Sequence, residues 1–386
     1  MNNRTLELAY YDFYQVLLTP LILILGLIIC LIFVPKKQKE LVFVSILYIW
    51  HTCFSLLYWY LSINGVADAV SYFKKTFRVP FNINLSPGTR FTEFVSYIIR
   101  TSLDSNYLNT TLVFNIVGSL GIVFIYLSLR NYLKEISRYW SLVLFIPSMS
   151  YWSSAIGKDS VVFFAISIFI YAITTSKKKT LLVSVSLAIL FMIRPHIALA
   201  ILLSFIVYFI LQSNSHIILK VISLPFIIGI STIALGFVQE YVGVDEVSVE
   251  GVEEYFDGRK HLNMGGGSSI DTSSMILPVK MFSYIFRPFP FEAHSLIAFI
   301  ASIENSILFC SFAYIAYKAK DYFNIIFKNE NLWLLLYTII TWIMLSYGLK
   351  NLGIAARQKW MFMPVIIYLL LDIYSNYKRK RFNTNL

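Results

Sequence analysis

The chain has 386 residues, of which 58% are hydrophobic and only 14% are charged, and its mean hydropathy is +0.68. Soluble globular proteins of this length are less apolar, so the composition excludes that class and indicates a polytopic membrane protein. The net charge of +11 does not indicate a nucleic-acid-binding protein, because Lys and Arg form short clusters between apolar runs rather than one basic face.

Apolar runs near the roughly 20 residues that cross a bilayer recur along the whole chain. We therefore predict an all-α polytopic integral membrane protein, with about eleven transmembrane helices in a single transmembrane domain covering residues 1–386. The first residues lack the basic start and cleavage site of a signal peptide, which predicts that the first apolar run remains as a helix.

Basic clusters set the predicted topology of the first three helices. A helix over about 16–34 precedes Lys36, Lys37 and Lys39, which the positive-inside rule assigns to the cytoplasm, so the N-terminus is predicted outside. A helix over about 41–61 returns to an outer loop, residues 62–109, and a third over about 110–129 ends at another basic turn. Within the loop, apolar residues have the spacing of an amphipathic juxtamembrane helix, namely Phe91, Phe94, Val95, Ile98 and Ile99.

Two short hairpins are predicted next. The stretch P-S-M-S-Y-W-S-S-A-I-G-K-D-S over 147–160 interrupts an apolar run that has basic residues at both ends, which directs Lys158 and Asp159 to the outer side. A second pair of short helices, about 181–193 and 197–211, breaks at Arg194-Pro195-His196. Shortened helices with charge at the break can leave a pocket open to water.

The remaining third of the chain is predicted to contain a helix over about 217–238, an acidic outer loop over 239–290, and three further helices. The glycine run after Met264 has no following Lys-Ser/Thr, so it does not predict a phosphate-binding loop. Glu304 lies near the middle of a predicted helix, where a charge costs roughly 2.5–3.5 kcal/mol unless it is paired. The last helix ends in the basic run 378–381, which places the C-terminus in the cytoplasm.

Basic residues normally avoid the outer side, so their gathering there predicts a bound anion. Arg donates forked, charge-assisted hydrogen bonds to phosphate, and a diphosphate on a lipid carrier would suit several such residues. The candidate substrate-binding residues are Lys158, Arg194, His196, Arg287, Glu292, His294, Arg357 and Lys359. The alternative is that these are snorkelling or paired side chains at helix ends.

Asp68 and Asp159 are the candidate catalytic carboxylates. Asp68 stands alone in the segment D-A-V-S-Y-F of the first outer loop, where it could take the proton of an incoming sugar hydroxyl while Arg and Lys stabilise a departing phosphate. The alternative for Asp68 is a helix N-cap.

The sequence predicts neither a metal site nor a disulfide. The histidines are scattered, and Cys30, Cys53 and Cys310 lie singly in apolar runs without CxxC spacing. No cofactor is expected.

Four segments resemble a known group of enzymes: P-S-x-x-x-W-S-S-A-x-G-K-D-S, the R-P-H break, D-A-V-S-Y-F, and N-L-G-I-A-A-R-Q-K-W-M-F-M-P near the end. They are similar to bacterial O-antigen or capsule repeat-unit polymerases (Wzy-type) and to related GT-C class membrane glycosyltransferases. By position, Asp68 would match the first-loop acid of GT-C enzymes, and Arg194, Arg287 and Arg357 the outer-loop arginines of polymerases. Unlike those families, this chain has an extra helix before Asp68 and lacks a clear pair of Arg-rich loops.

The resemblance implies a polymerase of undecaprenyl-diphosphate-linked oligosaccharides on the outer face of the bacterial cytoplasmic membrane. Membrane lipids and other polysaccharide assembly proteins would be its partners, and nucleic acid would not. Three alternatives stay open: a flippase of the same lipid-linked sugars, a single-sugar GT-C transferase, and an acyltransferase of cell-surface glycans. A flippase needs a polar path across the whole membrane, and an acyltransferase needs a catalytic His deep in the bundle with a carboxylate nearby.

Overall fold

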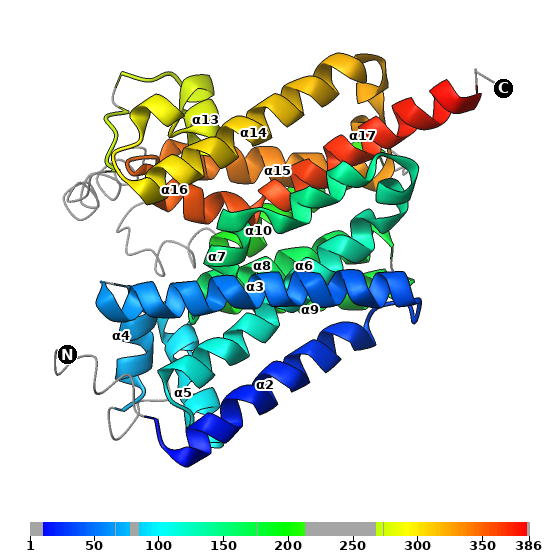
Figure 1. Ribbon diagram of the computed structural model, residues 1–386. Coiled ribbons are helices and arrows are strands. Elements are labelled where there is room, and N and C mark those ends of the chain that lie inside the picture. Colours follow the sequence, from blue (N-terminus) through cyan, green and yellow to red (C-terminus); the bar gives the residue numbers. More distant parts are fainter. Residues whose placement is uncertain are drawn as a thin grey trace. The chain divides into compact units, whose positions relative to one another are not determined.

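The computed structural model describes residues 11–65, 67–77, 85–175, 177–212, 268–272 and 274–383. Within them the chain is almost entirely helical and contains no β-strand (Figure 1). The predicted all-α class is therefore confirmed. The chain forms two compact units, one of residues 1–131 and 137–194, the other of residues 132–136 and 195–386. That both belong to a single transmembrane domain stays a prediction.

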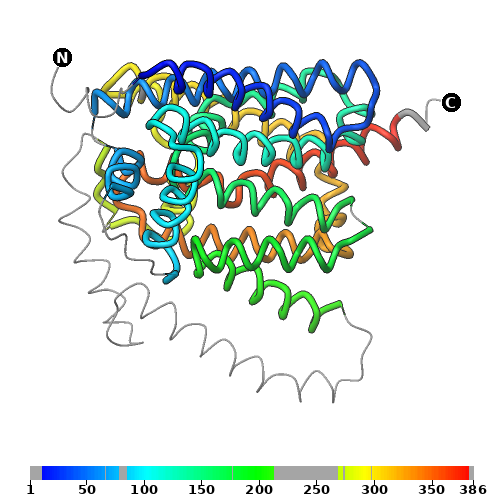
Figure 2. The backbone as a smooth tube through the Cα atoms, turned by 90° about the horizontal axis from the view of Figure 1, so that it is seen from below, coloured from blue at the N-terminus to red at the C-terminus, as the bar shows by residue number. Residues whose placement is uncertain are grey.

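Three long apolar helices dominate the first unit: α2 (Phe13–Ile32), α3 (Gln38–Asn64) and α6 (Tyr107–Glu135). Asp12 caps α2 by accepting a hydrogen bond from the Gln15 backbone N–H at 2.8 Å. A turn after α2 reverses the chain, so that α2 and α3 form an antiparallel hairpin (Figure 2). The most apolar stretch of α6 is 78% buried, against 28% in α2 and in α3, which makes α6 the central helix of this unit.

The serine-rich stretch forms a break between helices. A 3₁₀ helix, η1 (Arg138–Phe145), leads into the short α7 (Pro147–Ser153), and after a turn the chain enters α8 (Lys158–Thr174). The run from Tyr139 to the break therefore does not form a membrane-spanning helix, because its helical geometry changes at Pro147. Next, α9 (Lys179–Ile193) packs antiparallel to α8, and the Ser186 hydroxyl donates a 2.7 Å hydrogen bond to the Ala165 carbonyl.

Two short helices, α4 (Asp68–Lys75) and α5 (Thr89–Leu103), occupy the first predicted loop. A helix is present where the amphipathic helix was predicted: in α5, Val95 and Ile99 pack against a buried apolar cluster, whereas Ile98 is 43% exposed. That α5 lies at the membrane surface stays a prediction. An ion pair of 2.5 Å between Lys75 and Glu93 joins α4 to α5.

The first unit has two chemically different ends. Arg130 of α6 donates to Glu40 of α3 at 3.3 Å, close to the lysines between α2 and α3. At the opposite end of the same helices, Gln15 of α2 donates a 2.6 Å hydrogen bond to the Asp104 carbonyl and accepts one from the side chain of Asn109. We call the first of these the lysine end. We call the second the break end, because α8 begins and α9 ends at this second end.

The described part of the second unit is built from helices, which include α10 (Pro195–Gln212), α13 (Leu277–Phe286), η2 (Pro290–Glu292), α14 (Leu296–Lys318), η3 (Lys320–Phe327), α15 (Asn329–Tyr347) and α17 (Met363–Asn383). Between α15 and α17 lie α16 (Leu352–Gln358) and the 3₁₀ turn η4 (Lys359–Met361). The Trp333 indole of α15 donates to the Ile201 carbonyl of α10 at 3.2 Å, and the Tyr337 hydroxyl donates to the Met361 carbonyl at 2.6 Å. These bonds hold α10, α15 and η4 together.

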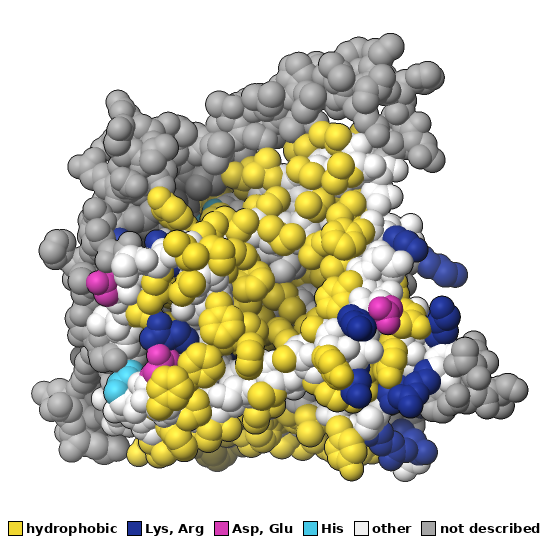
Figure 3. Space-filling model, turned by 90° about the horizontal axis from the view of Figure 1, so that it is seen from above, with side chains coloured by type: hydrophobic (Ala, Val, Ile, Leu, Met, Phe, Trp, Pro, Cys, Tyr) yellow, Lys and Arg dark blue, Asp and Glu magenta, His cyan; other side chains and the backbone are white. Residues whose placement is uncertain are grey.

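Five described helices are long and apolar enough to cross a membrane: α2, α3, α6, α10 and the 298–318 part of α14. The bent pair α16–α17, with a 59° angle at its break, would make a sixth. Figure 3 shows a face with a broad band of hydrophobic side chains between two ends that carry charged side chains, with more Lys and Arg at one end than at the other, a distribution that suits a bilayer. These features suggest a membrane protein.

The predicted count of about eleven spans is not supported. Helices α8 and α9 have 17 and 15 residues, which at about 1.5 Å per residue gives roughly 25 and 22 Å, short of a hydrocarbon core of about 30 Å. The helix predicted over 217–238 and most of the loop predicted over 239–290 lie outside the described residues.

Candidate functional site

An enclosed ion pair lies at the break end of the first unit. Arg194 Nη2 is 2.9 Å from Asp159 Oδ1, and the two side chains are only 11% and 12% exposed. Arg194 directly follows α9, and its backbone N–H donates to the Leu190 carbonyl at 2.6 Å. Burial of a charge is costly unless it is paired, so each of these side chains holds the other in place.

The guanidinium of Arg194 retains donor capacity. Its Nε is buried and has no hydrogen-bond partner among the described residues. A buried guanidinium donor without a partner is uncommon, because the lost hydrogen bond to water is not replaced. An oxygen of an anionic ligand would satisfy it.

Lys158 and Asp159 are the first two residues of α8, whose N-cap, Gly157, offers no side-chain hydrogen bond. The backbone N–H groups at a helix start carry a partial positive charge that favours anions. The start of α8 is therefore electropositive, and it carries two cations and one carboxylate, namely Lys158, Arg194 and Asp159.

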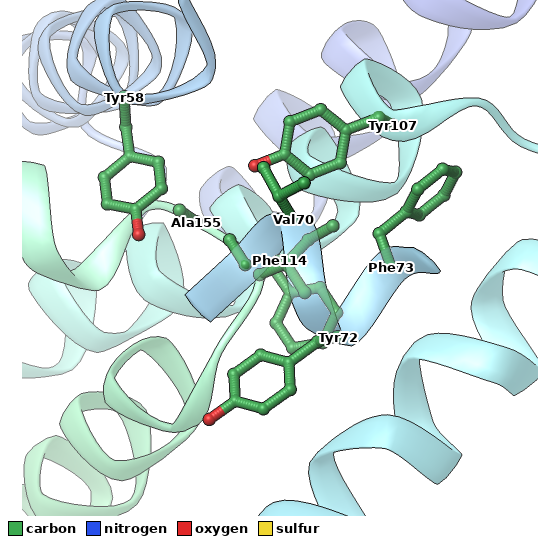
Figure 4. Close-up of a cluster of buried hydrophobic side chains, with 9 residues drawn as sticks. Tyr58, Val70, Tyr72, Phe73, Tyr107, Phe114 and Ala155 are labelled. Atoms are coloured by element: carbon green, nitrogen blue, oxygen red, sulfur yellow. The ribbon is translucent and has the colours of Figure 1, made fainter. Parts of the chain in front are cut away.

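Asp68 joins this region through the packing of its helix. It is the first residue of α4, and the N-cap is Ala67, so the alternative of Asp68 as N-cap is wrong. Tyr72 and Phe73 of α4 belong to one apolar cluster with Ala155 and Ile156 of the break, shown in Figure 4. This cluster fixes α4, and with it the backbone of Asp68, to the turn that precedes Lys158.

A buried polar network around His51 connects α7 to α3 and α6. The sequence analysis did not predict this network. His51 Nε2 is 2.9 Å from Ser153 Oγ, and His51 Nδ1 is 2.6 Å from Asn115 Oδ1 and 3.0 Å from Ser119 Oγ. All four side chains are at most 2% exposed. The order Ser–His–Asn matches that of a nucleophile, a base and an orienting group, but the burial of these side chains gives the network an anchoring role for α7.

Apart from Gly118, which lies inside the helix predicted over about 110–129, no sequence signal pointed to this network, because its members come from three distant segments and include a His without acidic neighbours. A Cβ at Gly118 would overlap the Ser153 carbonyl oxygen, so a larger residue would push α7 away from α6.

In the second unit, Arg287 and Glu292 form a clamp across the turn between α13 and α14. Arg287 Nε donates to Glu292 Oε2 at 3.1 Å, Arg287 Nη2 is 2.5 Å from Glu292 Oε1, and the Phe289 backbone N–H donates to Glu292 Oε2 at 2.8 Å. Partial burial alone would raise the pKa of Glu292, but these hydrogen bonds and the Arg287 charge outweigh the effect of burial and hold the pKa below its ordinary value.

His294 lies two residues after Glu292. Its side chain is exposed, and its Nε2 is 3.4 Å from Ser268 Oγ.

Lys359 is enclosed rather than open to a ligand. Its Nζ lies 3.5 Å from Glu304 and donates to Asn305 Oδ1 at 2.7 Å, and its side chain is 2% exposed. The charge of Glu304, which requires a partner in a helix interior, thus has one. Asn305 also donates to the Pro288 carbonyl at 3.4 Å, so Lys359 and the turn after Arg287 are linked through it.

The other two predicted residues also belong to the second unit. Arg357 lies in the last turn of α16, which is followed directly by Lys359 in η4. His196 is the second residue of α10 and is half-buried. The structure thus groups Lys158, Asp159 and Arg194, with α4 beside them, in one unit and the remaining candidates in the other. No group of three or more His, Cys, Asp or Glu that could hold a metal occurs within the described ranges.

No family model, no curated protein and no solved structure matches this chain. The arrangement of the break end is therefore the basis for assigning a function. Its cations can bind an anion next to an apolar surface, and its carboxylates can accept a proton.

Proposed function

We propose that the chain is a membrane glycosyltransferase of the polysaccharide polymerase type, which joins undecaprenyl-diphosphate-linked oligosaccharide units on the outer face of the bacterial cytoplasmic membrane. The observation that carries the proposal is the enclosed Arg194, which pairs with Asp159 at the start of α8 and whose Nε has no hydrogen-bond partner in the part of the chain that the structure describes. The resemblance of the segments around Lys158, Arg194 and Asp68 to such enzymes supports the same reading.

The first requirement of this reaction is stabilisation of a leaving diphosphate. In the proposal, the diphosphate binds Arg194, Lys158 and the first N–H groups of α8, all of which complement negative charge. Its charge competes with that of Asp159 for the guanidinium, so substrate binding loosens the ion pair. The undecaprenyl chain remains in the bilayer beside the helices.

The second requirement is a base for the acceptor hydroxyl. The acceptor oxygen attacks the anomeric carbon, the bond from that carbon to the diphosphate oxygen breaks, and undecaprenyl diphosphate leaves with the bonding electrons. The hydroxyl proton goes to a carboxylate. Asp68 is the proposed base, and Asp159, once released from Arg194, orients the acceptor. No nucleotide cofactor is needed because the donor is already activated.

The candidates of the second unit take supporting roles in the proposal. Lys359 is satisfied by Glu304 and Asn305, and Arg287 by Glu292, so both pairs order the turns around them. Arg357, His196 and His294 stay predicted substrate-binding residues of their own unit, and the transfer at the break end is proposed without them.

The size distribution of surface glycan in a strain lacking this gene, resolved on a gel, tests the proposal. A polymerase predicts collapse of a long ladder to a core bearing one repeat unit, restored by the wild-type gene. A full ladder lacking one side-chain sugar would instead indicate a single-sugar transferase, and loss of every repeat unit would indicate a flippase. An unchanged profile would remove the chain from polysaccharide assembly altogether.

A further inference from the structure

A cavity of about 560 Å³ lies in the second unit, at the end where α17 finishes. It is lined by Asp321, Tyr322, Asn324, Ile325, Asn376, Arg379 and Lys380. Its volume falls within the range of about 300–1,000 Å³ that small-molecule sites occupy. None of these residues belongs to the proposed glycosyl-transfer site.

The basic residues of α17 are held in position around this cavity. Arg379 Nη2 donates to both carboxylate oxygens of Glu135, at 2.7 and 2.8 Å. Lys380 Nζ lies 5.9 Å from the centre of the Tyr322 ring, and Arg381 donates to the Tyr377 hydroxyl at 3.1 Å. A phenol ring orders a cation without itself cancelling the charge.

A row of tyrosine rings connects the cavity to α14. Tyr314 of α14 packs on Tyr374 at 6.1 Å between ring centres, Tyr374 on Tyr377 at 5.9 Å, and Tyr377 on Tyr322 at 6.0 Å. Tyrosine is enriched where the headgroups of a bilayer meet its hydrocarbon, because its ring is apolar and its hydroxyl polar. The row therefore marks a depth at which a lipid headgroup would lie.

The surface of α14 that leads away from this row is apolar. Ile303 and Ile307 are 42% and 61% exposed, and Tyr317, just before η3, is 74% exposed. An acyl chain can lie on such a surface, whereas a soluble anion gains nothing from it.

We propose that this cavity binds the phosphate headgroup of an anionic membrane phospholipid, whose acyl chains lie along the exposed surface of α14. Arg379 and Lys380 contribute two positive charges to the lining and Asp321 one negative charge. Because Glu135 pairs with Arg379, Lys380 is the cation on which attraction of the headgroup depends most. The Asn324 side chain adds an amide donor. Basic pockets at the cytoplasmic ends of membrane helices suit anionic headgroups, and the basic end of α17 is the end predicted to be cytoplasmic.

Native mass spectrometry of the full chain, purified in a non-ionic detergent, tests this proposal. The probes are phosphatidylglycerol, phosphatidylcholine and inorganic phosphate. We expect retention of phosphatidylglycerol in preference to phosphatidylcholine, a loss of about fivefold in its affinity with Lys380→Gln, and a gain with Asp321→Asn.

Lys378→Gln is the matched control, because Lys378 lies over the Tyr374 ring, at 5.7 Å, and does not line the cavity. It should leave phosphatidylglycerol binding near the wild-type level. Equal losses with Lys378→Gln and Lys380→Gln would overturn the proposal in favour of a diffuse attraction to the basic tail. Equal retention of phosphatidylcholine, or displacement of the lipid by an equal concentration of inorganic phosphate, would also overturn it.

Discussion

Among single residues, Asp159 and Arg194 give the sharpest prediction. Arg194→Gln removes the guanidinium that pairs with the enclosed Asp159 carboxylate, which should lower the free energy of unfolding by about 3–5 kcal/mol. The double variant Asp159→Asn/Arg194→Gln removes both charges and should recover most of that loss. Thermal unfolding in detergent measures both.

Arg130→Gln is the control for this series, because it breaks the Arg130–Glu40 pair at the lysine end of the same unit, where the Arg side chain is 28% exposed. Arg130→Gln should lower the free energy of unfolding by less than Arg194→Gln does, since a partly exposed ion pair contributes less to stability than an enclosed one. A double variant as unstable as the single Arg194→Gln would show that packing, rather than an unpaired charge, causes the loss.

Gly118 gives a second residue-scale prediction. A Cβ at this position would overlap the Ser153 carbonyl oxygen and come within 2.8 Å of His51 Cε1. Gly118→Ala should therefore lower the free energy of unfolding by about 2 kcal/mol, because neither α6 nor α7 can yield without breaking the His51 network.

Gly121→Ala is the comparison for Gly118→Ala, since it lies one turn further along α6 and its added Cβ first meets the Phe163 ring at 2.7 Å. A ring can rotate more easily than a backbone carbonyl can shift, so the melting temperature should fall less than for Gly118→Ala. The reverse order would contradict the anchoring of α7 on Gly118.

Some of these residue contacts could be predicted from the sequence and others could not. The cost of a charge in the interior of a helix predicted that Glu304 needs a partner, and Lys359 is that partner. The choice of Lys359 could not be predicted, because a sequence does not show which of several basic turns reaches a given helix. The His51 network was missed for the same reason, as its members lie far apart along the chain.

At the scale of elements, the turn between α13 and α14 should be pH-sensitive. The folded-state pKa of Glu292 lies below its unfolded value, so its contribution to stability is present above the unfolded pKa of about 4.3 and is lost as pH falls through the lowered pKa. Both side chains of the clamp are less than a quarter exposed. The melting temperature should fall more steeply below about pH 4 in the wild type than in Glu292→Gln, and parallel profiles would contradict this role of the clamp.

The long helices α2 and α3 begin and end within three residues of their predicted positions, because a continuous apolar run bounded by charge leaves few alternatives. Helix α6 begins equally close to its predicted start but continues to Glu135, past the predicted end near 129. The elements between Arg138 and Ser153 were less predictable. Pro147 indicated a break, but the change from a 3₁₀ helix to the short α7 depends on contacts with α3 and with Gly118, which lie elsewhere in the chain.

At the scale of the whole molecule, the two ends of the first unit should face opposite sides of the membrane. In a chain with Cys30, Cys53 and Cys310 replaced by Ser, Asp104→Cys marks the break end and Lys37→Cys the lysine end. A membrane-impermeant maleimide should label the first in intact spheroplasts and the second only after permeabilisation. The opposite pattern would place the proposed site in the cytoplasm.

The most direct test of the proposed site is complementation of the deletion strain with point variants, read as the glycan ladder. Asp159→Asn/Arg194→Gln and Arg130→Gln are compared at equal membrane levels of protein, which separates folding from activity. We predict that the Arg130 variant restores the long ladder, whereas the double variant leaves a core with a single repeat unit. A full ladder from the double variant would rule out the proposed site, because glycan transfer would then proceed without the Asp159–Arg194 pair.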